Sequence, residues 1–445
     1  MTLGLTKILR VISGQTLTVE RTIQAIVFIV QVTPIGTNLG LANLLWAMVS
    51  GAFLSSRGAV FPALQLGGLS AAEIRRSWSA MRHGSWQIDE LVETWGVYVA
   101  SENAWCENRY EGLRVVSVDL TGFWRPRLQG WLGKHYHSLM GKALPAVVFG
   151  VIIVSGQIHG KRVPLLRKIV RCQPEQTEAD YRATVLREVA GLDLPGDVKA
   201  LDAGFKLNEL RNAGLKGFVL RMQSNCTARR SHLPAYKGRG AKPKYGALVR
   251  PVARTHGQNE LPATPPDQTT TFQRDERTIQ VAFWHGLVTS DTKVADVQAT
   301  FSLYVFTDPR YTKPLVLATD LDLQPETVLA IYLDRWPVEH PPLAAKQMVG
   351  LHRQFVFAPE ACFRLPELAL LAGSILAYVA AVSPAIPTGF WDRQPQATPG
   401  RLRRLLARVD FPNMTEFDPE VRKKASVTDH LPKGVQAHRR QKTAA

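Results

Sequence analysis

Residues 332–346 read YLDRWPVEHPPLAAK and carry four polar side chains at distinctive intervals. These side chains are separated by three, four and seven positions: Tyr332, Arg335, Glu339 and Lys346. On a helix this spacing places them near one face, with a carboxylate between two cations and a phenol. Such a group suits Mg²⁺ held against a phosphate, because Mg²⁺ takes carboxylate oxygens and the cations neutralise the phosphate. The alternative is an amphipathic surface helix whose charges pair four residues apart.

The pattern Y-x2-R-x3-E-x6-K is followed by an apolar, helix-like stretch at residues 366–383, which we expect to be buried. This combination resembles the signature of DDE-type insertion-sequence transposases, in the branch named for these four residues. The resemblance implies an α/β fold, in which a ribonuclease-H-like mixed sheet is flanked by helices and a β-rich insertion precedes the last catalytic helix. It also implies two catalytic aspartates upstream of Glu339, and a role for Tyr332, Arg335 and Lys346 in positioning the DNA end.

The composition of the 445-residue chain points to a polyanionic partner. Lys and Arg number 54 against 37 Asp and Glu, which gives a net charge of +17. A hydrophobic content of 45% indicates a packed core rather than a disordered basic protein. The four cysteines form no C-x2-C pair, and the eleven histidines, including His135 and His137, form no convincing ligand set. No segment clears the length of a membrane span, so we expect a cytoplasmic, nucleoid-associated protein.

The first 108 residues have a helical pattern. Ser70 and Glu73 are spaced as a capping box at the start of one helix, and a second helix over residues 87–97 follows a short glycine-containing turn. Two interpretations stay open for this pair: a helix-turn-helix that grips transposon ends, or a helical hairpin that packs on the next domain. The family resemblance favours DNA-end binding.

The run LRVVSVDLTGF, residues 113–123, contains valines and flanking glycines that predict a buried strand. Asp119 is expected at the end of this strand. A lone ionised carboxylate in such a strand needs a partner or a cation. Residues 121–174 then contain nine Lys or Arg and no acidic residue, so a positive field suited to a nucleic-acid backbone adjoins Asp119. Two strands predicted within residues 143–166 match the second and third strands that the resemblance implies.

Asp202 follows a short apolar strand in the segment VKALDAGFKLNELRNAGLKGFVLR, residues 198–221. Ala203 and Gly204 permit a close turn there, and a helix and another strand are expected to follow. The resemblance places the second catalytic aspartate at this position. The alternative for Asp202 is a structural N-cap of the following helix. Asp193 and Asp197 lie nearby in what reads as a loop.

Residues 227–254 form the most basic stretch, with tyrosines interleaved among the cations and no acidic residue. Glycines and a proline predict a mobile loop or ribbon that lays cations along phosphates while Tyr236 and Tyr245 stack on sugars or bases. A merely solvated basic loop is the alternative. The candidate DNA-binding cations of this stretch are Arg229, Arg230, Lys237, Arg239, Lys242 and Lys244.

Three further strands are predicted over residues 278–321, within the interval where the resemblance implies a β-rich insertion. The expected organisation is a helical N-terminal domain (1–108), the first part of the core (109–222), the basic β-rich insertion (223–323), the last part of the core (324–390) and a basic tail (391–445). The tail includes RLRRLLAR, a candidate amphipathic helix for DNA or a second subunit.

Together these residues imply a DNA transposase whose catalytic and metal-binding side chains are Asp119, Asp202 and Glu339. Two Mg²⁺ ions, replaceable by Mn²⁺, would let water cut the transposon end and the freed 3′ hydroxyl join it to target DNA. The expected partners are terminal inverted repeats, target DNA and a second copy of the chain, with no membrane.

Pro341 and Pro342 depart from the family, which runs a continuous helix through Glu and Lys. Because proline is tolerated only in the first turn of a helix, either the helix begins near His340 or the geometry of the site is damaged. The alternative functions are therefore a transposase-derived DNA-binding protein with impaired catalysis, and a ribonuclease-H-like nuclease that never joins strands.

Overall fold

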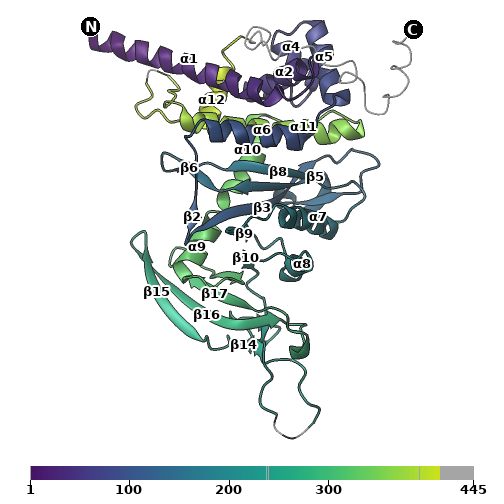
Figure 1. Cartoon of the computed structure of the whole chain (residues 1–445), viewed down its shortest axis with the longest axis vertical. Helices are drawn as coiled ribbons and strands as arrows, with labels where there is room; N and C mark the ends of the chain where they lie inside the picture. Colours follow the sequence, from purple (N-terminus) through teal and green to yellow (C-terminus); the bar gives the residue numbers. More distant parts are fainter. Residues whose placement is uncertain (1, 237, 239, 390, 411–445) are drawn as a thin grey trace. The chain divides into compact units, whose positions relative to one another are not determined.

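The structure, a computed structural model, describes residues 2–236, 238, 240–389 and 391–410. It is a mixed α/β fold with a large mixed sheet flanked by helices (Figure 1). The packing divides the chain into two compact units. Unit 1 comprises Met1–Glu107, Leu120–Tyr181 and Pro337–Ala445, and unit 2 comprises Asn108–Asp119 and Arg182–Trp336. The chain passes from one unit to the other inside a strand, inside a helix, and within the signature stretch.

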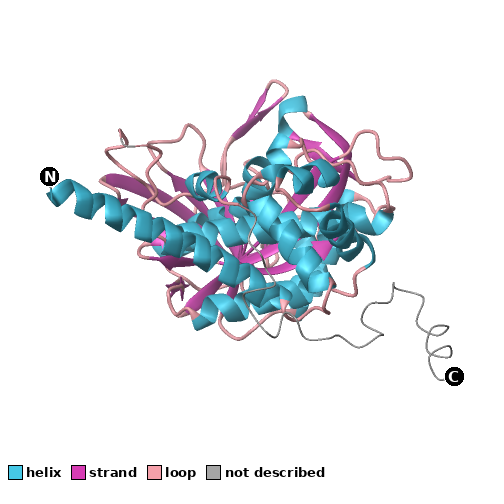
Figure 2. Ribbon diagram, turned by 90° about the horizontal axis from the view of Figure 1, so that it is seen from above, coloured by secondary structure: helices cyan, strands magenta, loops and turns pink. Residues whose placement is uncertain are grey.

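The N-terminal part of unit 1 is helical, as predicted, and begins with one long helix (Figure 2). Its helices are α1 (Thr2–Val30), α2 (Thr37–Val49), α3 (Ala52–Ser55), α4 (Val60–Leu66), α5 (Ala71–His83) and α6 (Ile88–Ser101). The capping box at the start of α5 is confirmed: Ser70 accepts a hydrogen bond from the Glu73 amide, and the Glu73 carboxylate accepts one from the Ser70 amide. Two orphan amides of the first turn are satisfied in this way.

Helix α11 (Pro359–Val382) forms the centre of unit 1 and confirms the buried apolar stretch. By length and composition it is the one helix among the described residues that could cross a membrane, but 83% of its most apolar part is buried inside the protein. Its charged side chains have partners within unit 1. Glu367 accepts two hydrogen bonds from Arg171, and Arg364 donates to the backbone oxygens of Met81 and Gly84. The helix is therefore a core element of this unit.

The strands of unit 1 lie beside α6 and α11, which pack on β8 (Figure 1). β5 (Lys142–Val154) pairs antiparallel with β8 (Leu165–Arg171) and with β4 (Lys134–His137). β5 confirms the first of the two strands predicted within residues 143–166. The second differs from the prediction, because residues 156–162 form two short strands and β8 begins only at Leu165. A small separate sheet contains β1 (Cys106–Glu107), β6 (Gly156–Ile158) and β7 (Lys161–Arg162). All four cysteines are free, as expected.

Unit 2 is built on one sheet with β3 (Leu113–Trp124) at its end. The order from there is β9 (Asp197–Leu201), β10 (Phe218–Met222), β18 (Leu315–Thr319), β17 (Phe301–Thr307), β16 (Arg277–Thr289), β11 (Ala228–Arg230) and β12 (Leu248–Val249). β3, β9 and β10 run parallel, and the later strands are antiparallel. The strands predicted over residues 278–321 are confirmed as β16, β17 and β18, so the predicted insertion continues the sheet that carries Asp202.

The remaining elements of unit 2 connect or cover these strands. They are β2 (Arg109–Tyr110), the hairpin of β13 (Arg254–His256) and β14 (Asn259–Leu261), β15 (Gln268–Arg274), α8 (Leu207–Asn212) and α9 (Pro325–Leu333). Helix α7 (Glu178–Gly191) leads into unit 2. α9 packs on β9 and β10, where its apolar residues join a core of valines from the parallel strands.

One predicted boundary is wrong. β3 does not end at Asp119 but continues to Trp124, so the aspartate lies in the middle of the strand. The last residues of β3 belong to unit 1, where the Arg125 amide donates to the Pro145 carbonyl and extends the sheet pattern beyond the strand. Partners distant in the sequence, rather than the local run of valines, decide where this strand ends.

Candidate functional site: two aspartates on neighbouring strands

Asp119 and Asp202 stand at the same level of the sheet in unit 2. β3 and β9 pair in parallel, and the last printed partners in their register are Val118 and Leu201. Asp119 and Asp202 are the next residue on each chain, and both side chains are half-buried. Parallel neighbours are about 4.8 Å apart across a sheet, so two like charges come close together here. The structure thus brings together two of the three predicted catalytic carboxylates.

The turn after β9 holds the Asp202 carboxylate. The Gly204 amide donates to Oδ1 of Asp202 over 2.9 Å, which closes the tight turn predicted from Ala203 and Gly204. The N-cap of α8 is Lys206, so the alternative of Asp202 as an N-cap is wrong. A Cβ atom at position 204 would lie 2.9 Å from Oδ1, so the absence of a side chain there lets the carboxylate occupy its place.

Two nearby aspartates have structural partners instead. Asp197 is the first residue of β9 rather than part of a loop, and its Oδ1 accepts a hydrogen bond of 2.7 Å from Arg114 Nε. Asp193 pairs with the buried Lys199 at 2.6 Å. Each of these carboxylates is neutralised by a cation within unit 2, which leaves Asp202 as the candidate catalytic residue of this segment.

Glu339 belongs to unit 1, which the chain enters at Pro337. The predicted single helix through the signature is wrong: a 3₁₀ turn (Trp336–Glu339) is followed by α10 (His340–Leu343) and by a π-helical turn (Ala344–Met348). Prolines cause this division, because each lacks the amide that a helix interior needs. Glu339 is the N-cap of α10 and half-buried, so the helix begins at His340, as one of the two predicted alternatives requires.

Tyr332 and Arg335 lie in unit 2 and contact each other. The Arg335 guanidinium lies over the Tyr332 ring, 5.8 Å from its centroid, and both residues are buried. Tyr332 lies in the last turn of α9 and packs in the core cluster that contains Val115 and Val198. These two signature residues are therefore anchored beneath the parallel strands of unit 2.

Lys346 lies in unit 1 among hydroxyl and aromatic groups. Its Nζ donates to Thr121 Oγ1 over 2.8 Å and stands 4.7 Å from the centroid of the Trp124 ring. His135 is close by, and burial, reinforced by the Lys346 charge, lowers the pKa of His135 to about 4. His135 is therefore neutral at pH 7. Thr121 and Trp124 are partners of the signature lysine that the sequence pattern did not reveal.

Some cations of the basic stretch form hydrogen bonds or ion pairs within unit 2, and others are exposed to solvent. Arg229 donates to the backbone oxygens of Ser290 and Gly246, and Arg230 forms a bidentate ion pair with Asp267. Lys242 and Lys244 are exposed and flank the loop that leads to β12. Lys237 and Arg239 lie outside the described residues. The exposed lysines are consequently the better candidates for phosphate contacts.

Helices α5 and α6 follow each other across a short turn but pack on different elements of unit 1: α5 packs on α2, and α6 packs on α1 and β8. The Trp86 indole donates to the Ala80 carbonyl over 2.9 Å and fixes the turn between them. The exposed face of α6 carries Asp89, Glu90 and Glu93, and three carboxylates would repel the phosphates that line a DNA groove. This charge, together with the packing of α6 on β8, favours the alternative in which these helices pack on the next part of the chain over a recognition helix. A second predicted surface is also occupied: α12 (Pro399–Leu406), the expected amphipathic helix, buries Leu402 and Leu406 in the core of unit 1.

The chemistry of the donor set fits a divalent cation at the aspartate pair. Two carboxylates at one level of a sheet supply the hard oxygen ligands that Mg²⁺ prefers, and water and phosphate oxygens normally complete its shell. Within the described residues no group of three or more His, Cys, Asp or Glu forms a metal-binding cluster. Asp119 and Asp202 are therefore the two predicted metal ligands that the structure places on neighbouring strands.

Comparison with protein-family models and with curated proteins finds no match for this chain.

Proposed function

We propose that the protein is a DNA transposase that cuts transposon ends and joins them to target DNA in a metal-dependent reaction. The observation that carries this proposal is the position of Asp119 and Asp202, one residue beyond the paired Val118 and Leu201 on two parallel strands. Two carboxylates so placed repel each other unless a cation is shared between them.

The order of the strands supports a ribonuclease-H-like core. The sheet runs β8, β5, β3, β9, β10, which is third, second, first, fourth and fifth if β3 is counted as the first strand of the core. α7 joins the third strand to the fourth, and α8 joins the fourth to the fifth. The two aspartates then fall on the central first strand and directly after the fourth, as the resemblance to DDE transposases implies.

In this proposal Asp119 and Asp202 hold the divalent cations, and Glu339 is the third catalytic carboxylate that the resemblance implies. Bound Mg²⁺ or Mn²⁺ activates the attacking hydroxyl group and stabilises the leaving 3′ oxygen. Of the signature residues, the half-buried Lys346 is the proposed contact with the DNA end strand, because Tyr332 and Arg335 are buried in unit 2. Exposed lysines such as Lys242 and Lys244 contact the sugar-phosphate backbone. Terminal inverted repeats, target DNA and a second copy of the chain are the proposed partners.

The prolines favour a second candidate function. Glu339 ends a 3₁₀ turn and is followed at once by a short helix with Pro341 and Pro342 in it, whereas the family has one continuous helix. A shifted third carboxylate would leave DNA binding intact while cleavage is impaired. The chain would then be a transposase-derived DNA-binding protein.

The decisive experiment is cleavage of duplexes taken from the DNA that flanks the reading frame, with Mg²⁺ present. We expect site-specific cuts by the natural protein and none by Asp119→Asn. The matched control is Asp296→Asn, because Asp296 is an exposed aspartate elsewhere in unit 2. Equal cutting by Asp119→Asn and the natural protein would refute the enzymatic assignment. A second arm with precut ends and a target plasmid separates a transposase, which joins the strands, from a nuclease, which does not.

A further inference from the structure

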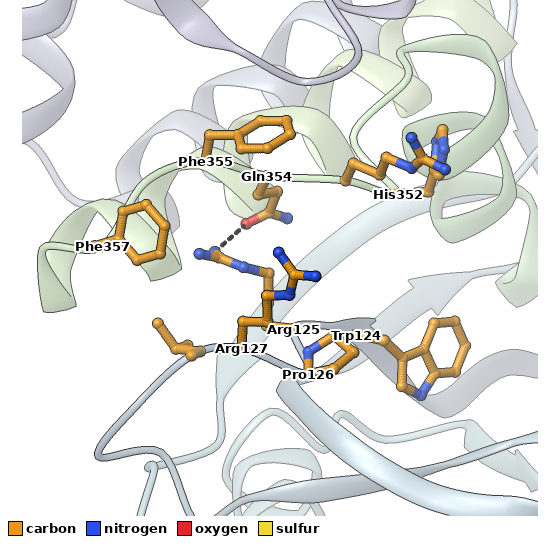
Figure 3. Close-up of a pocket in the computed structure, with 10 residues that line it drawn as sticks. Trp124, Arg125, Pro126, Arg127, His352, Gln354, Phe355 and Phe357 are labelled. Carbon is orange, nitrogen blue, oxygen red and sulfur yellow. Dashed lines mark hydrogen bonds between the residues drawn. The ribbon is translucent and has the colours of Figure 1, made fainter.

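A groove in unit 1 lies beside the end of β3 (Figure 3). Its volume is about 510 Å³, within the range of small-ligand sites. Its walls come from two segments far apart in the sequence, residues 124–128 and residues 352–357. In Figure 3, Phe355 and Phe357 form one side, Trp124 and Pro126 form the other, and the side chains of Arg125 and Arg127 project between them.

The lining combines cations with exposed aromatic rings. Phe355 is 56% exposed and Phe357 is 66% exposed, which is unusual for side chains that gain free energy from burial. Arg127 and Arg353 are exposed as well. Of the described residues that line the groove, none is acidic. The groove therefore offers ring faces and positive charge to one ligand.

Arg125 forms the floor of the groove and is only 6% exposed. Its guanidinium donates to the Gln354 side chain and to the Val356 carbonyl, and it lies 5.4 Å from the centroid of the Phe357 ring. The nearby thiol of Cys362 is neutral, because burial raises its pKa. Among the described residues no carboxylate contacts Arg125, so this buried cation has hydrogen bonds but no counter-charge. An anion in the groove would supply it.

The aromatic wall is held in place before any ligand arrives. The Arg353 carbonyl rests against Gly58, where a Cβ atom would lie only 2.0 Å from the oxygen. Gly58 also has a φ of +88°, which side-chain-bearing residues rarely adopt. Backbone contact of this kind fixes the segment, so binding costs little conformational entropy.

We propose that this groove binds an unpaired DNA nucleotide, with its base against Phe355 and Phe357 and its phosphate at Arg125 and Arg127. Aromatic rings with arginines are the combination by which proteins hold single strands without reading their sequence. The inference rests on the proposed function in one respect, because DNA cleavage is the reaction that provides an unpaired strand. The stacking faces and the buried cation both favour a single strand over a duplex, whose bases are already stacked.

The test is fluorescence anisotropy of a labelled oligo(dT) with the full chain, in EDTA so that no cleavage occurs. Phe357→Ala is expected to weaken binding by about tenfold, the loss typical of one stacked base. Arg127→Gln is expected to reduce the slope of log affinity against log salt by about 0.7, the contribution of one phosphate on a single strand. Both residues are exposed, so these variants should fold normally.

Two matched controls carry the same changes outside the groove. Tyr136→Ala removes an exposed ring from β4, and Arg408→Gln removes an exposed cation near the end of the described chain. Both should bind oligo(dT) like the natural protein. The proposal is overturned if Phe357→Ala and Arg127→Gln also match the natural protein. It is overturned as well if both variants reduce the affinity for an unlabelled duplex competitor as much as the affinity for the single strand. A dependence on the groove that is seen for oligo(rU) but not for oligo(dT) would also overturn it.

Cleavage assays on the natural protein and on Asp119→Asn, run beside the oligo(dT) binding measurements, separate this inference from the proposed function. If oligo(dT) binding depends on Phe357 while the natural protein cuts no DNA, only the transposase assignment fails. If the protein cuts DNA in an Asp119-dependent manner while the groove variants bind normally, only the groove proposal fails.

Discussion

The two ends of the β3–β9 pair treat charge in opposite ways. At one end Arg114 and Asp197 form an ion pair at 2.7 Å, and the Asp197 side chain is almost fully buried. At the other end the register sets two aspartates, Asp119 and Asp202, at the same level. At the first end the charge of Asp197 is neutralised by Arg114 of the same chain. The second end places two like charges on neighbouring strands, where a bound cation would reduce their repulsion.

Unit 1 shows the same contrast with cations. Arg171 makes bidentate contacts with Glu360 and Glu367, and all three side chains are satisfied by one another. Arg125 is more deeply buried than Arg171 but has only neutral partners. The lesson is that burial alone does not mark a functional charge. Arg125, which no carboxylate contacts among the described residues, is the cation that an anionic ligand would complete.

The same substitution, aspartate to asparagine, can be made at both ends of β9, and the largest effect is expected at Asp202. Asp202→Asn should reduce metal-dependent DNA cleavage below detection, because Asn carries no charge to hold the cation. Its stability without metal should not fall, since one of two repelling charges is removed. Cleavage assays beside urea unfolding in EDTA measure both effects. Retained cleavage, or a large loss of stability, would give Asp202 a structural role instead.

Asp197→Asn is expected to do the reverse. Removal of the carboxylate leaves Arg114 without its ion-pair partner, and breaking a buried pair costs about 3 kcal/mol of unfolding free energy. The urea midpoint of the transition that includes unit 2 should fall, while cleavage by the folded protein persists. A variant that keeps its stability but loses cleavage would place Asp197, not Asp202, in the site.

Gly204→Ala sharpens the account of how Asp202 is held. The new Cβ atom would stand 2.9 Å from Oδ1 of Asp202, so the carboxylate must turn away. We expect cleavage to fall about tenfold, because small displacements of catalytic groups are costly, with little change in stability. Gly191→Ala is the control, since a Cβ atom there meets nothing within 4 Å. Identical rates for the two variants would show that the turn does not position Asp202.

A smaller effect concerns another closed pair, Arg230 and Asp267. The hydrogen bond and charge of Arg230 lower the pKa of Asp267 below its usual value. The pair therefore stabilises the fold above the ordinary Asp pKa of about 3.9, and this contribution is lost as the pH falls through the lower folded-state pKa. The Asp267 side chain is 31% exposed, so the effect should stay under about 1 kcal/mol. The urea midpoint of Asp267→Asn should therefore fall less than that of the natural protein between pH 6 and pH 3. The same pH profile for both proteins would contradict a stabilising role of the Arg230–Asp267 pair.

Local sequence patterns predicted the elements that carry the aspartates. Alternating and continuous apolar residues around Val115 and Val198 specify buried strands, and the glycine after Asp202 specifies a turn. The end of β3 was not predictable in this way. Residues 120–124 belong to the strand because unit 1 supplies neighbours for them, and those neighbours lie beyond any local window.

The signature stretch shows a second limit. Its spacing suggested one helix face, but the prolines divide the stretch into a 3₁₀ turn, a short helix and a π-helical turn. The prolines themselves signalled a break, and only the structure showed where the next helix begins. The groove was missed altogether. Arg125 and Gln354 are 229 positions apart, and no periodicity connects them.

The account depends most directly on whether the aspartate pair binds a divalent cation. Titration calorimetry of the metal-free protein with Mn²⁺ measures this without DNA. We predict a saturable binding heat for the natural protein and for Asp296→Asn, and its loss when Asp119→Asn and Asp202→Asn are combined. The same heat in the combined variant would contradict the assignment of these two aspartates as a metal site.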